Sequence, residues 1–334
     1  MYIRRAQRER SLFLCGRLPG EDFAEPVPHG TCFMVQEGGA GPPFVYIVTA
    51  RHALEALQKG GLIYLRANRG DRSDALRPGE GVAYIKLKSE GWLFHPDPTV
   101  DLAVGPFDLV ADKSATEDAT VSFYIDSLAA IINEPAYLSS LPSDRDVPWP
   151  PFEGEEVIFI GLMTHFRGQH TNLPIVRTGT IALVTDEPIK GHYGLSKYHV
   201  INATCYPGNS GAPVWVYYPR ADDGSGLHSL YYLGVLTFGY PTLEELRKVR
   251  GTEHAYYNLG LSLVTPIEKV VDILNSEKEA KRRSEKSGGG LQGIPLSAVP
   301  EEPRFSRADF EMALKKVSRR GGKRVTEKPD PTSS

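Results

Sequence analysis

The chain alternates short apolar runs with breaks rich in glycine, proline and aspartate along most of its 334 residues. One set of candidate strands covers 31–36, 44–49, 62–67, 82–87, 101–104 and 121–125, and a second covers 156–160, 175–184, 198–203, 212–218, 231–238 and 258–264. Short strands separated by turn residues are typical of all-β sandwiches and barrels. The pattern therefore predicts an all-β fold built from two sets of strands, and helices are too scarce for an α/β fold.

A second feature concerns chemistry. In the segment 205–213 (CYPGNSGAP), Gly208 and Gly211 flank Ser210. Glycines on both sides of a serine let the backbone present a hydroxyl beside unpaired N–H groups, as a nucleophile beside its oxyanion hole requires. The run alone is equally consistent with an ordinary glycine-rich turn, so its meaning depends on residues elsewhere.

Two upstream segments supply partners for such a serine. The segment 47–54 (IVTARHAL) is an apolar strand that ends in a short turn carrying His52, and in 100–104 (VDLAV) Asp101 opens a short strand. A neutral imidazole can accept the serine proton, and a buried carboxylate can orient the imidazole. The order His52, Asp101, Ser210 is that of chymotrypsin-type enzymes, whereas subtilisins and α/β-hydrolases order the three residues differently.

Together these segments resemble the T-A-x-H, D-[IL]-A-[LV] and G-[DN]-S-G-[GS]-P motifs of trypsin-like serine peptidases of the chymotrypsin fold. The resemblance extends to 234–239 (GVLTFG), similar to the substrate-binding strand, and to 259–266 (LGLSLVTP), similar to the final strand of the bacterial HtrA-type branch. It covers roughly 29–275 and implies two six-stranded antiparallel β-barrels with a C-terminal closing helix.

The resemblance also implies roles for individual residues. Ser210 is expected to be the nucleophile, His52 the general base and Asp101 the orienting carboxylate, with the N–H groups of Gly208 and Ser210 forming the oxyanion hole. Asn209 carries no charge, so it cannot make the ion pair with a new N-terminus that activates the digestive enzymes.

The expected substrate pocket is formed by Thr204, Thr237, Phe238 and Gly239. Thr204 occupies the position where trypsins carry the aspartate that selects lysine or arginine. The resemblance therefore implies a small or medium uncharged residue before the scissile bond.

The predicted domain organisation is an N-terminal extension (1–28), a peptidase domain (29–275, with barrels at about 29–130 and 153–265 and a helix at 266–280), a flexible linker (281–304) and a tail (305–334). A capping-box pattern at 265–268 and an apolar stripe predict the helix at 266–280. A similar pattern predicts a short amphipathic helix in the tail, which we expect to dock on the protease or on a partner. No PDZ-like domain is evident after residue 275.

Composition indicates the cellular compartment and excludes some classes of partner. Cys15, Cys32 and Cys205 are odd in number and widely spaced, which favours a reducing cytoplasm, although a Cys15–Cys32 bridge remains open. The net charge of −3 gives no sign of a nucleic-acid or membrane partner. We expect no signal peptide, membrane helix, metal or cofactor, and a protein or peptide substrate.

Two other functions stay open at this point. The protein could be a catalytically weak protease homologue that acts as a protein-binding module, or an esterase, because the same triad cleaves esters. The oligomeric state is not indicated.

Overall fold

The computed structural model describes residues 8–16, 25–37, 44–59, 62–68, 81–107, 125–127, 151–219, 228–248 and 251–288. The chain divides into two units, 1–289 and 290–334, and the second lies outside the described residues. The predicted tail helix, most of the predicted strand at 121–125 and nearly all of the connection at 133–151 also lie outside them.

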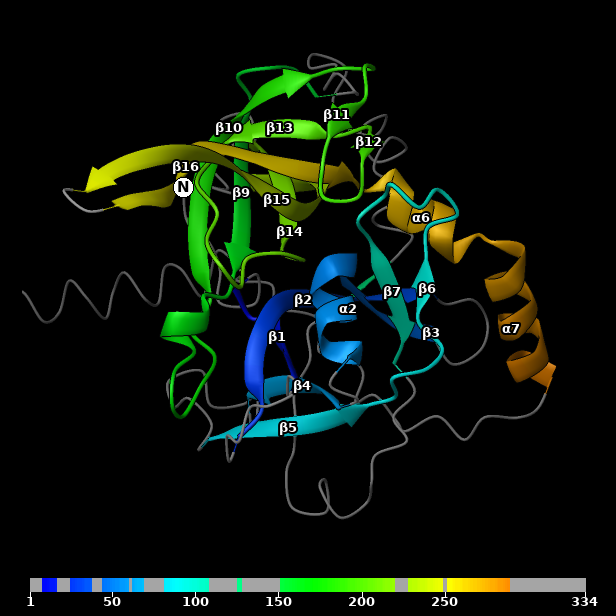
Figure 1. The fold of residues 1–334 in the computed structure, drawn as a ribbon. Helices are drawn as coiled ribbons and strands as arrows, with labels where there is room; N and C mark the ends of the chain where they lie inside the picture. The colour runs from blue at the N-terminus through cyan, green and yellow to red at the C-terminus, as the bar shows by residue number, and fades with distance from the viewer. Residues whose placement is uncertain are drawn as a thin grey trace, which may run out of the picture. The chain divides into compact units, whose positions relative to one another are not determined.

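The all-β prediction is confirmed: the described residues form two large sheets and one two-stranded sheet, with few helices (Figure 1). The first sheet has the order β5-β4-β1-β2-β3-β7-β6, with β8 paired to β2. Its strands are β1 (Leu12–Gly16), β2 (Val27–Glu37), β3 (Phe44–Thr49), β4 (Ile63–Asn68), β5 (Val82–Leu87), β6 (Leu93–Phe94), β7 (Ala103–Pro106) and β8 (Ile125–Ser127). Over the described residues this sheet is not closed, so only one of the two expected barrels is seen as such.

The second sheet is a closed barrel with the order β10-β13-β16-β15-β14-β9. Its strands are β9 (Glu156–Gly161), β10 (Ile175–Val184), β13 (His199–Asn202), β14 (Pro213–Pro219), β15 (His228–Lys248) and β16 (Gly251–Pro266). A small hairpin of β11 (Ile189–Lys190) and β12 (Leu195–Ser196) is inserted between β10 and β13. Alternate residues such as Val157, Phe159 and Val214 point inward and fill the barrel core.

The two sheets share an apolar cluster. Phe33 and Tyr46 of the first sheet pack with Ile158 and Trp215 of the barrel, and the ring centroids of Phe33 and Tyr232 are 5.8 Å apart. Because these side chains are almost fully buried, the cluster fixes one sheet against the other.

The N-terminal region corrects one prediction. The short apolar run that begins at Leu12 was assigned to an extension outside the domain, but it forms β1, which lies between β2 and β4. All five residues of β1 are buried. A run that is too short for a signal peptide has the right length for a buried strand.

Two helices follow the barrel where one was predicted at 266–280. They are α6 (Glu268–Leu274) and α7 (Glu277–Gly288), separated at Asn275 and Ser276. The expected capping box does not form, because the Thr265 hydroxyl contacts the Thr237 hydroxyl at 3.1 Å inside the barrel. The first part of the predicted linker is helical as well.

Helix α7 is ordered by polar contacts rather than by an apolar stripe. Glu279 is completely buried, where it accepts a hydrogen bond of 2.6 Å from Tyr46 Oη of the first sheet and a bidentate pair from Arg282. The charge-rich sequence from 277 to 288 does not by itself indicate these contacts, because their partners lie on a distant strand and on the same helix face.

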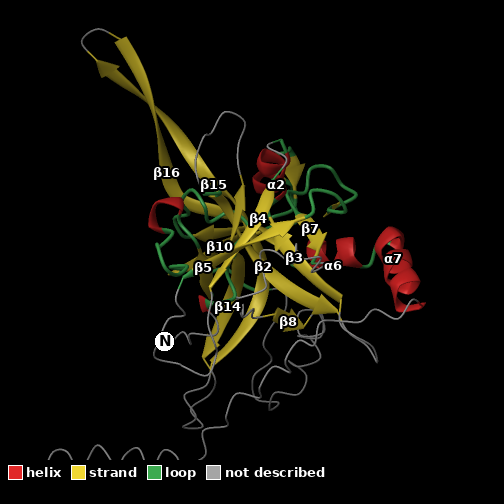
Figure 2. Ribbon diagram, turned by 90° about the horizontal axis from the view of Figure 1, so that it is seen from below, coloured by secondary structure: helices red, strands yellow, loops and turns green. Residues whose placement is uncertain are grey.

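Strands β15 and β16 are longer than the predicted 231–238 and 258–264. Their pairing continues from Pro241↔Asn258 to Lys248↔Gly251 as a two-stranded ribbon, which extends away from the barrel in Figure 2. The polar composition of this stretch concealed the extension.

Candidate active site

His52 lies at the start of α2 (Arg51–Gln58), a helix that directly follows β3 where the sequence predicted only a turn. Ala53, Leu54 and Leu57 are buried on one side of this helix, which anchors it to the first sheet. The position of His52 is therefore set by the packing of the whole helix.

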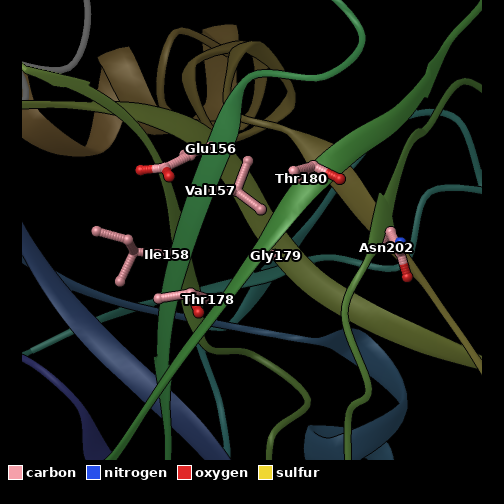
Figure 3. A pocket seen from close by; sticks show the side chains of 7 residues that line it. All are labelled: Glu156, Val157, Ile158, Thr178, Gly179, Thr180 and Asn202. Atoms are coloured by element: carbon pink, nitrogen blue, oxygen red, sulfur yellow. The ribbon is translucent and has the colours of Figure 1, made fainter.

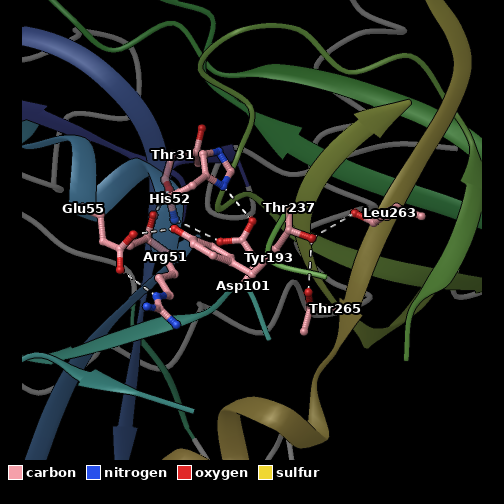
Figure 4. Close-up of polar contacts among 10 residues, drawn as sticks. Thr31, Arg51, His52, Glu55, Asp101, Tyr193, Thr237, Leu263 and Thr265 are labelled. Atoms are coloured by element: carbon pink, nitrogen blue, oxygen red, sulfur yellow. Dashed lines mark hydrogen bonds and ion pairs between the residues drawn. The ribbon is translucent and has the colours of Figure 1, made fainter. Parts of the chain in front are cut away.

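Asp101 and His52 form a close pair. Asp101 Oδ2 lies 2.7 Å from His52 Nδ1, and Asp101 Oδ1 accepts a hydrogen bond of 3.0 Å from the His52 backbone N–H (Figure 4). Asp101 is 0% exposed and the His52 side chain is 25% exposed. A buried carboxylate bonded in this way orients the ring and leaves Nε2 available toward solvent.

The turn that carries Ser210 is held by Asn209. Asn209 Oδ1 accepts a hydrogen bond of 2.8 Å from the Tyr206 N–H, and Asn209 Nδ2 donates one of 3.2 Å to the Leu162 carbonyl. Gly208 has a φ of 97°, a conformation that side chains disfavour. The turn therefore needs both the amide at 209 and the glycine at 208.

The turn lies against the segment that leads into His52. The Thr31 N–H donates to the Ser210 carbonyl at 2.8 Å. A Cβ at Gly211 would lie 2.4 Å from Thr49 Oγ1 and 3.1 Å from the Ala50 nitrogen, so the two backbones touch there. The turn that carries Ser210 therefore contacts the chain at Ala50, two positions before His52.

The backbone N–H groups of this turn divide into two kinds. Those of Asn209, Gly211 and Ala212 donate to the carbonyls of Tyr206, Leu236 and Asn209. Within the part of the chain that the structure describes, the N–H groups of Gly208 and Ser210 have no partner. Two unpaired donors beside a serine can stabilise an oxyanion.

The Ser210 hydroxyl is not hydrogen-bonded to His52 among the described residues. Catalytic hydrogen bonds are often long before substrate binds.

The predicted pocket residues are only partly brought together. Thr237 is buried, with its hydroxyl turned to Thr265, so only its backbone could line a pocket. Thr204 is partly exposed, and a Cβ at Gly260 would lie 3.9 Å from Thr204 Oγ1. Gly260 was not among the predicted pocket residues, although a glycine inside a strand often marks a bulge or the close approach of a ligand or another backbone. Phe238 and Gly239 are partly buried on β15.

The β11–β12 hairpin brings two further side chains to the site. The ring centroid of His192 lies 5.1 Å from that of His52 and 6.4 Å from that of Phe238. Tyr193 Oη donates a hydrogen bond of 2.6 Å to Glu55 of α2. Sequence reasoning missed both residues, and the only local signal was an aromatic pair between Gly191 and Gly194.

Charges around Tyr193 hold the hairpin to α2. The Arg51 guanidinium lies 4.5 Å from the Tyr193 ring centroid, and Arg51 Nε donates to Glu55 at 2.7 Å. Burial, the hydrogen bond to Glu55 and the nearby Asp101 charge raise the pKa of Tyr193. Although burial opposes it, hydrogen bonds from Tyr193 and Arg51 lower the pKa of Glu55. The pair thus consists of a protonated donor and a charged acceptor at neutral pH.

A hollow of about 360 Å³ lies elsewhere on the barrel. Figure 3 shows its lining by β9, β10 and β13, with residues Glu156, Val157, Ile158, Thr178, Gly179, Thr180 and Asn202. It contains none of the predicted site residues and only one ionisable side chain, Glu156, so it offers no acid–base pair.

Cys15, Cys32 and Cys205 form no disulfide, so the bridge left open above is not made. Cys15 is opposite Pro28 and Cys32 is opposite Leu12 in the β1–β2 register, which separates the two thiols along the strands. No helix among the described residues is long and apolar enough to span a bilayer. Those residues also contain no cluster of three metal-ligating side chains.

No protein-family model and no curated protein matches this chain. Solved structures do. The MamO protease domain from Magnetospirillum magneticum is 11% identical with a TM-score of 0.43, and the match covers 81% of this chain and 99% of that one. The Rv3671c protease in an inactive form is 13% identical with a TM-score of 0.36 (80% and 89% covered). A serine-to-alanine mutant of Rv3671c from M. tuberculosis H37Rv is 14% identical, also with a TM-score of 0.36 (86% and 91% covered).

Proposed function

We propose that the protein is a serine endopeptidase that hydrolyses peptide bonds through Ser210, His52 and Asp101 and an acyl-enzyme intermediate. One observation carries the proposal: the Ser210 turn, with two unpaired N–H groups, lies against the segment leading into His52, whose Nδ1 is 2.7 Å from a buried Asp101 oxygen. The three sequence motifs support it independently.

In the proposed reaction, His52 Nε2 accepts the Ser210 proton as Oγ attacks the carbonyl carbon. Asp101 holds the proton on Nδ1 and stabilises the imidazolium that forms. His52 then protonates the leaving amine, and water releases the acyl group by the reverse sequence of proton transfers.

The N–H groups of Gly208 and Ser210 would stabilise the oxyanion. Loss of one such donor is worth roughly 3 kcal/mol in a serine peptidase. Gly208 is essential to this role because its φ of 97° strains any other residue.

We infer an uncharged primary specificity. Thr204 supplies a hydroxyl rather than a carboxylate, and the missing side chain of Gly260 leaves space beside it. A peptide library tests this inference: preference for a small or medium uncharged residue is expected, and a dominant preference for arginine or lysine would refute it.

We further propose a cytoplasmic enzyme of the HtrA-type branch, acting on protein or peptide substrates. The absence of disulfides among three cysteines supports a reducing compartment. The uncharged Asn209 argues against activation by N-terminal cleavage, so we assign regulation to loops or to a partner of the tail.

A fluorophosphonate probe tests the proposal directly. We expect the wild-type chain to be labelled at Ser210, and Ser210→Ala and His52→Ala to be unlabelled. Comparison of new N-termini in a proteome exposed to wild type and to Ser210→Ala would then identify substrates. Equal labelling of wild type and Ser210→Ala defeats the proposal.

One observation favours the alternative of a protein-binding module. The Ser210 hydroxyl is not bonded to His52, and the His192 ring lies near the His52 ring, with a centroid distance of 5.1 Å and a tilt of 35°. A wild-type protein that binds peptides but never reacts with the probe would support this alternative, whereas probe reaction with ester but not peptide turnover would indicate an esterase.

A further inference from the structure

The loop between β9 and β10 begins with a single 3-10 turn, η1 (Thr164–Phe166), that is held at both ends. At its start, the Thr164 N–H donates to the Pro207 carbonyl at 3.3 Å. At its end, the Arg167 carbonyl accepts a hydrogen bond of 2.7 Å from Arg66 of β4. The η1 turn therefore joins the turn that carries Ser210 to the first sheet.

Arg66 is an unusual anchor because it is only 1% exposed and contacts no carboxylate among the described residues. Its guanidinium donates instead to Asn172 Oδ1 and to the Gly168 carbonyl, each at 2.6 Å. The rings of Phe13 and Tyr84 each lie 5.9 Å from the guanidinium carbon. A buried charge is tolerated when dipoles satisfy it, and most of these dipoles belong to the loop.

Asn172 completes the anchor from the loop side. Asn172 Nδ2 donates to the Arg66 carbonyl at 2.8 Å, and the Asn172 N–H donates to Asn68 Oδ1 at 2.7 Å. Elsewhere the loop is exposed, with Phe166 57% and Leu173 47% exposed.

Leu162, at the start of the loop, is buried and held separately: its N–H donates to Thr31 Oγ1 at 3.0 Å and its carbonyl accepts a hydrogen bond of 3.2 Å from Asn209 Nδ2. Arg66 and Asn172 hold the part of the loop that follows η1.

The near end of the loop forms the back of the candidate oxyanion hole. A Cβ at Gly208 would lie 2.6 Å from the Leu162 carbonyl oxygen and 2.9 Å from the Thr164 nitrogen, so the backbones are in contact. In a trans peptide the carbonyl and N–H point in opposite directions. With the Pro207 carbonyl directed at Thr164, the Gly208 N–H faces away from the loop.

We propose that Arg66 is a positioning residue for the oxyanion hole: it holds η1 in place, and η1 in turn fixes the orientation of the peptide between Pro207 and Gly208. The inference rests on the proposed function and assigns a remote arginine, on the other sheet, to transition-state stabilisation. Arg66 touches no reacting atom and acts only through the loop.

The first test is Arg66→Lys. Lysine keeps the charge but cannot reproduce the fork of hydrogen bonds to three acceptors. We expect kcat to fall about tenfold to hundredfold, below the full loss of an oxyanion donor, with KM within about twofold. Affinity for a peptide boronic acid, whose adduct places an oxygen in the hole, should fall in parallel.

A matched control is Arg283→Lys. Arg283 also binds a backbone carbonyl, that of Leu274 at 2.8 Å, but it anchors α7. We expect this variant to lower the melting temperature and leave kcat unchanged. If Arg66→Lys does the same, Arg66 is only structural and the proposal is wrong.

Asn172→Ala guards against a variant that fails to fold, because it removes two of the anchoring bonds and leaves Arg66 in place. A several-fold lower kcat is expected, and wild-type kcat and boronate affinity would contradict the proposal.

Hydrogen exchange separates this inference from the proposed function because it needs no activity. Amide exchange in peptides covering 162–173 and 206–212 should be faster in Arg66→Lys than in wild type. Unchanged exchange at 206–212 overturns the inference, whereas wild-type protein that is never labelled at Ser210 overturns the proposed function alone.

Discussion

At the scale of single residues, Asn209 holds its turn through neutral hydrogen bonds. It is 1% exposed and bonds to the backbone at Tyr206 and Leu162. Gly161 provides the space, since a Cβ there would lie 2.6 Å from Asn209 Nδ2. The turn is thus held within the folded chain without a charged partner for residue 209.

The three thiols are expected to differ in reactivity. Burial raises the pKa of Cys15 to about 12 and that of Cys32 well above its ordinary value, whereas Cys205 is partly exposed beside Thr204. A maleimide should therefore modify only Cys205 in the native protein, and it should inhibit the proposed peptidase activity by crowding the proposed pocket beside Thr204. Peptide mapping and activity assays check this, with Cys205→Ser as the resistant control; native labelling of Cys15 would contradict it.

His199 predicts a loss of stability in acid. Burial, and secondarily the charge of Lys197, lower its pKa from 6.5 to about 4. In the unfolded state His199 is protonated below about pH 6.5, whereas in the folded state it stays neutral down to about pH 4. The free energy of unfolding therefore decreases as the pH falls from 6.5 to 4. Between pH 7.5 and 5 the expected loss is about 2 kcal/mol.

Urea denaturation of wild type and His199→Gln at both pH values measures this loss. The glutamine variant should show a shallower dependence on pH, while His165→Gln, at an exposed position, should match wild type. Identical pH dependence in wild type and His199→Gln would show that His199 does not titrate as described.

At the scale of elements, the β11–β12 hairpin and α2 act as one assembly. In the chain the hairpin lies between β10 and β13 of the barrel. Its tip nevertheless contacts α2, the helix that carries His52 and packs on the first sheet. The Tyr193 hydroxyl donates to Glu55 of α2, and the His192 ring lies 5.1 Å from the His52 ring. The hairpin therefore ties the candidate base to the second sheet.

Tyr193→Phe tests this assembly. Removing the hydroxyl deletes the bond to Glu55, which is 34% exposed, so we expect a stability loss of about 1 kcal/mol. The helix would also be less well fixed, and kcat/KM should fall roughly threefold to tenfold. Kinetics and thermal unfolding check both values. Glu55→Gln keeps an acceptor and should retain more activity than Tyr193→Phe; wild-type kinetics in Tyr193→Phe would rule out a positioning role.

At the scale of the whole described unit, the C-terminal helices connect the barrel to the first sheet. Val270, Ile273 and Leu274 of α6 enter the cluster shared by the two sheets, and α7 contacts Tyr46 through Glu279. Burial raises the pKa of Tyr46 to about 12, so its hydroxyl stays a donor to Glu279 at neutral pH.

Glu279→Ala should destabilise the fold strongly. It leaves the Tyr46 hydroxyl and the Arg282 guanidinium without their buried acceptor, for which a loss of about 3 kcal/mol is expected. Urea denaturation measures it against Glu285→Ala, because the Glu285 side chain is 65% exposed and only 4.0 Å from Lys281. Equal urea midpoints for Glu279→Ala and Glu285→Ala would show that the contact of Glu279 with Tyr46 and Arg282 does not stabilise the fold.

Local patterns determined much of this protein. Short apolar runs bounded by turn residues predicted strands at 44–49, 82–87 and 175–184 that agree with β3, β5 and β10 to the residue, because strand-forming residues and chain-breaking residues are local signals. Glycine spacing around Ser210 predicted a tight turn, since a positive φ is a local property.

Contacts between segments far apart in the chain were decided only by the tertiary structure. The roles of His192, Tyr193, Glu279 and Arg66 depend on partners up to 233 positions away, as in the bond between Tyr46 and Glu279. The neighbouring sequence of a charged or polar residue can be the same whether its side chain lies on a solvated loop or in a buried contact. Sequence could therefore name the candidate triad, whereas the residues that hold its helix, its turn and its loop in register emerged only when the two sheets were packed together.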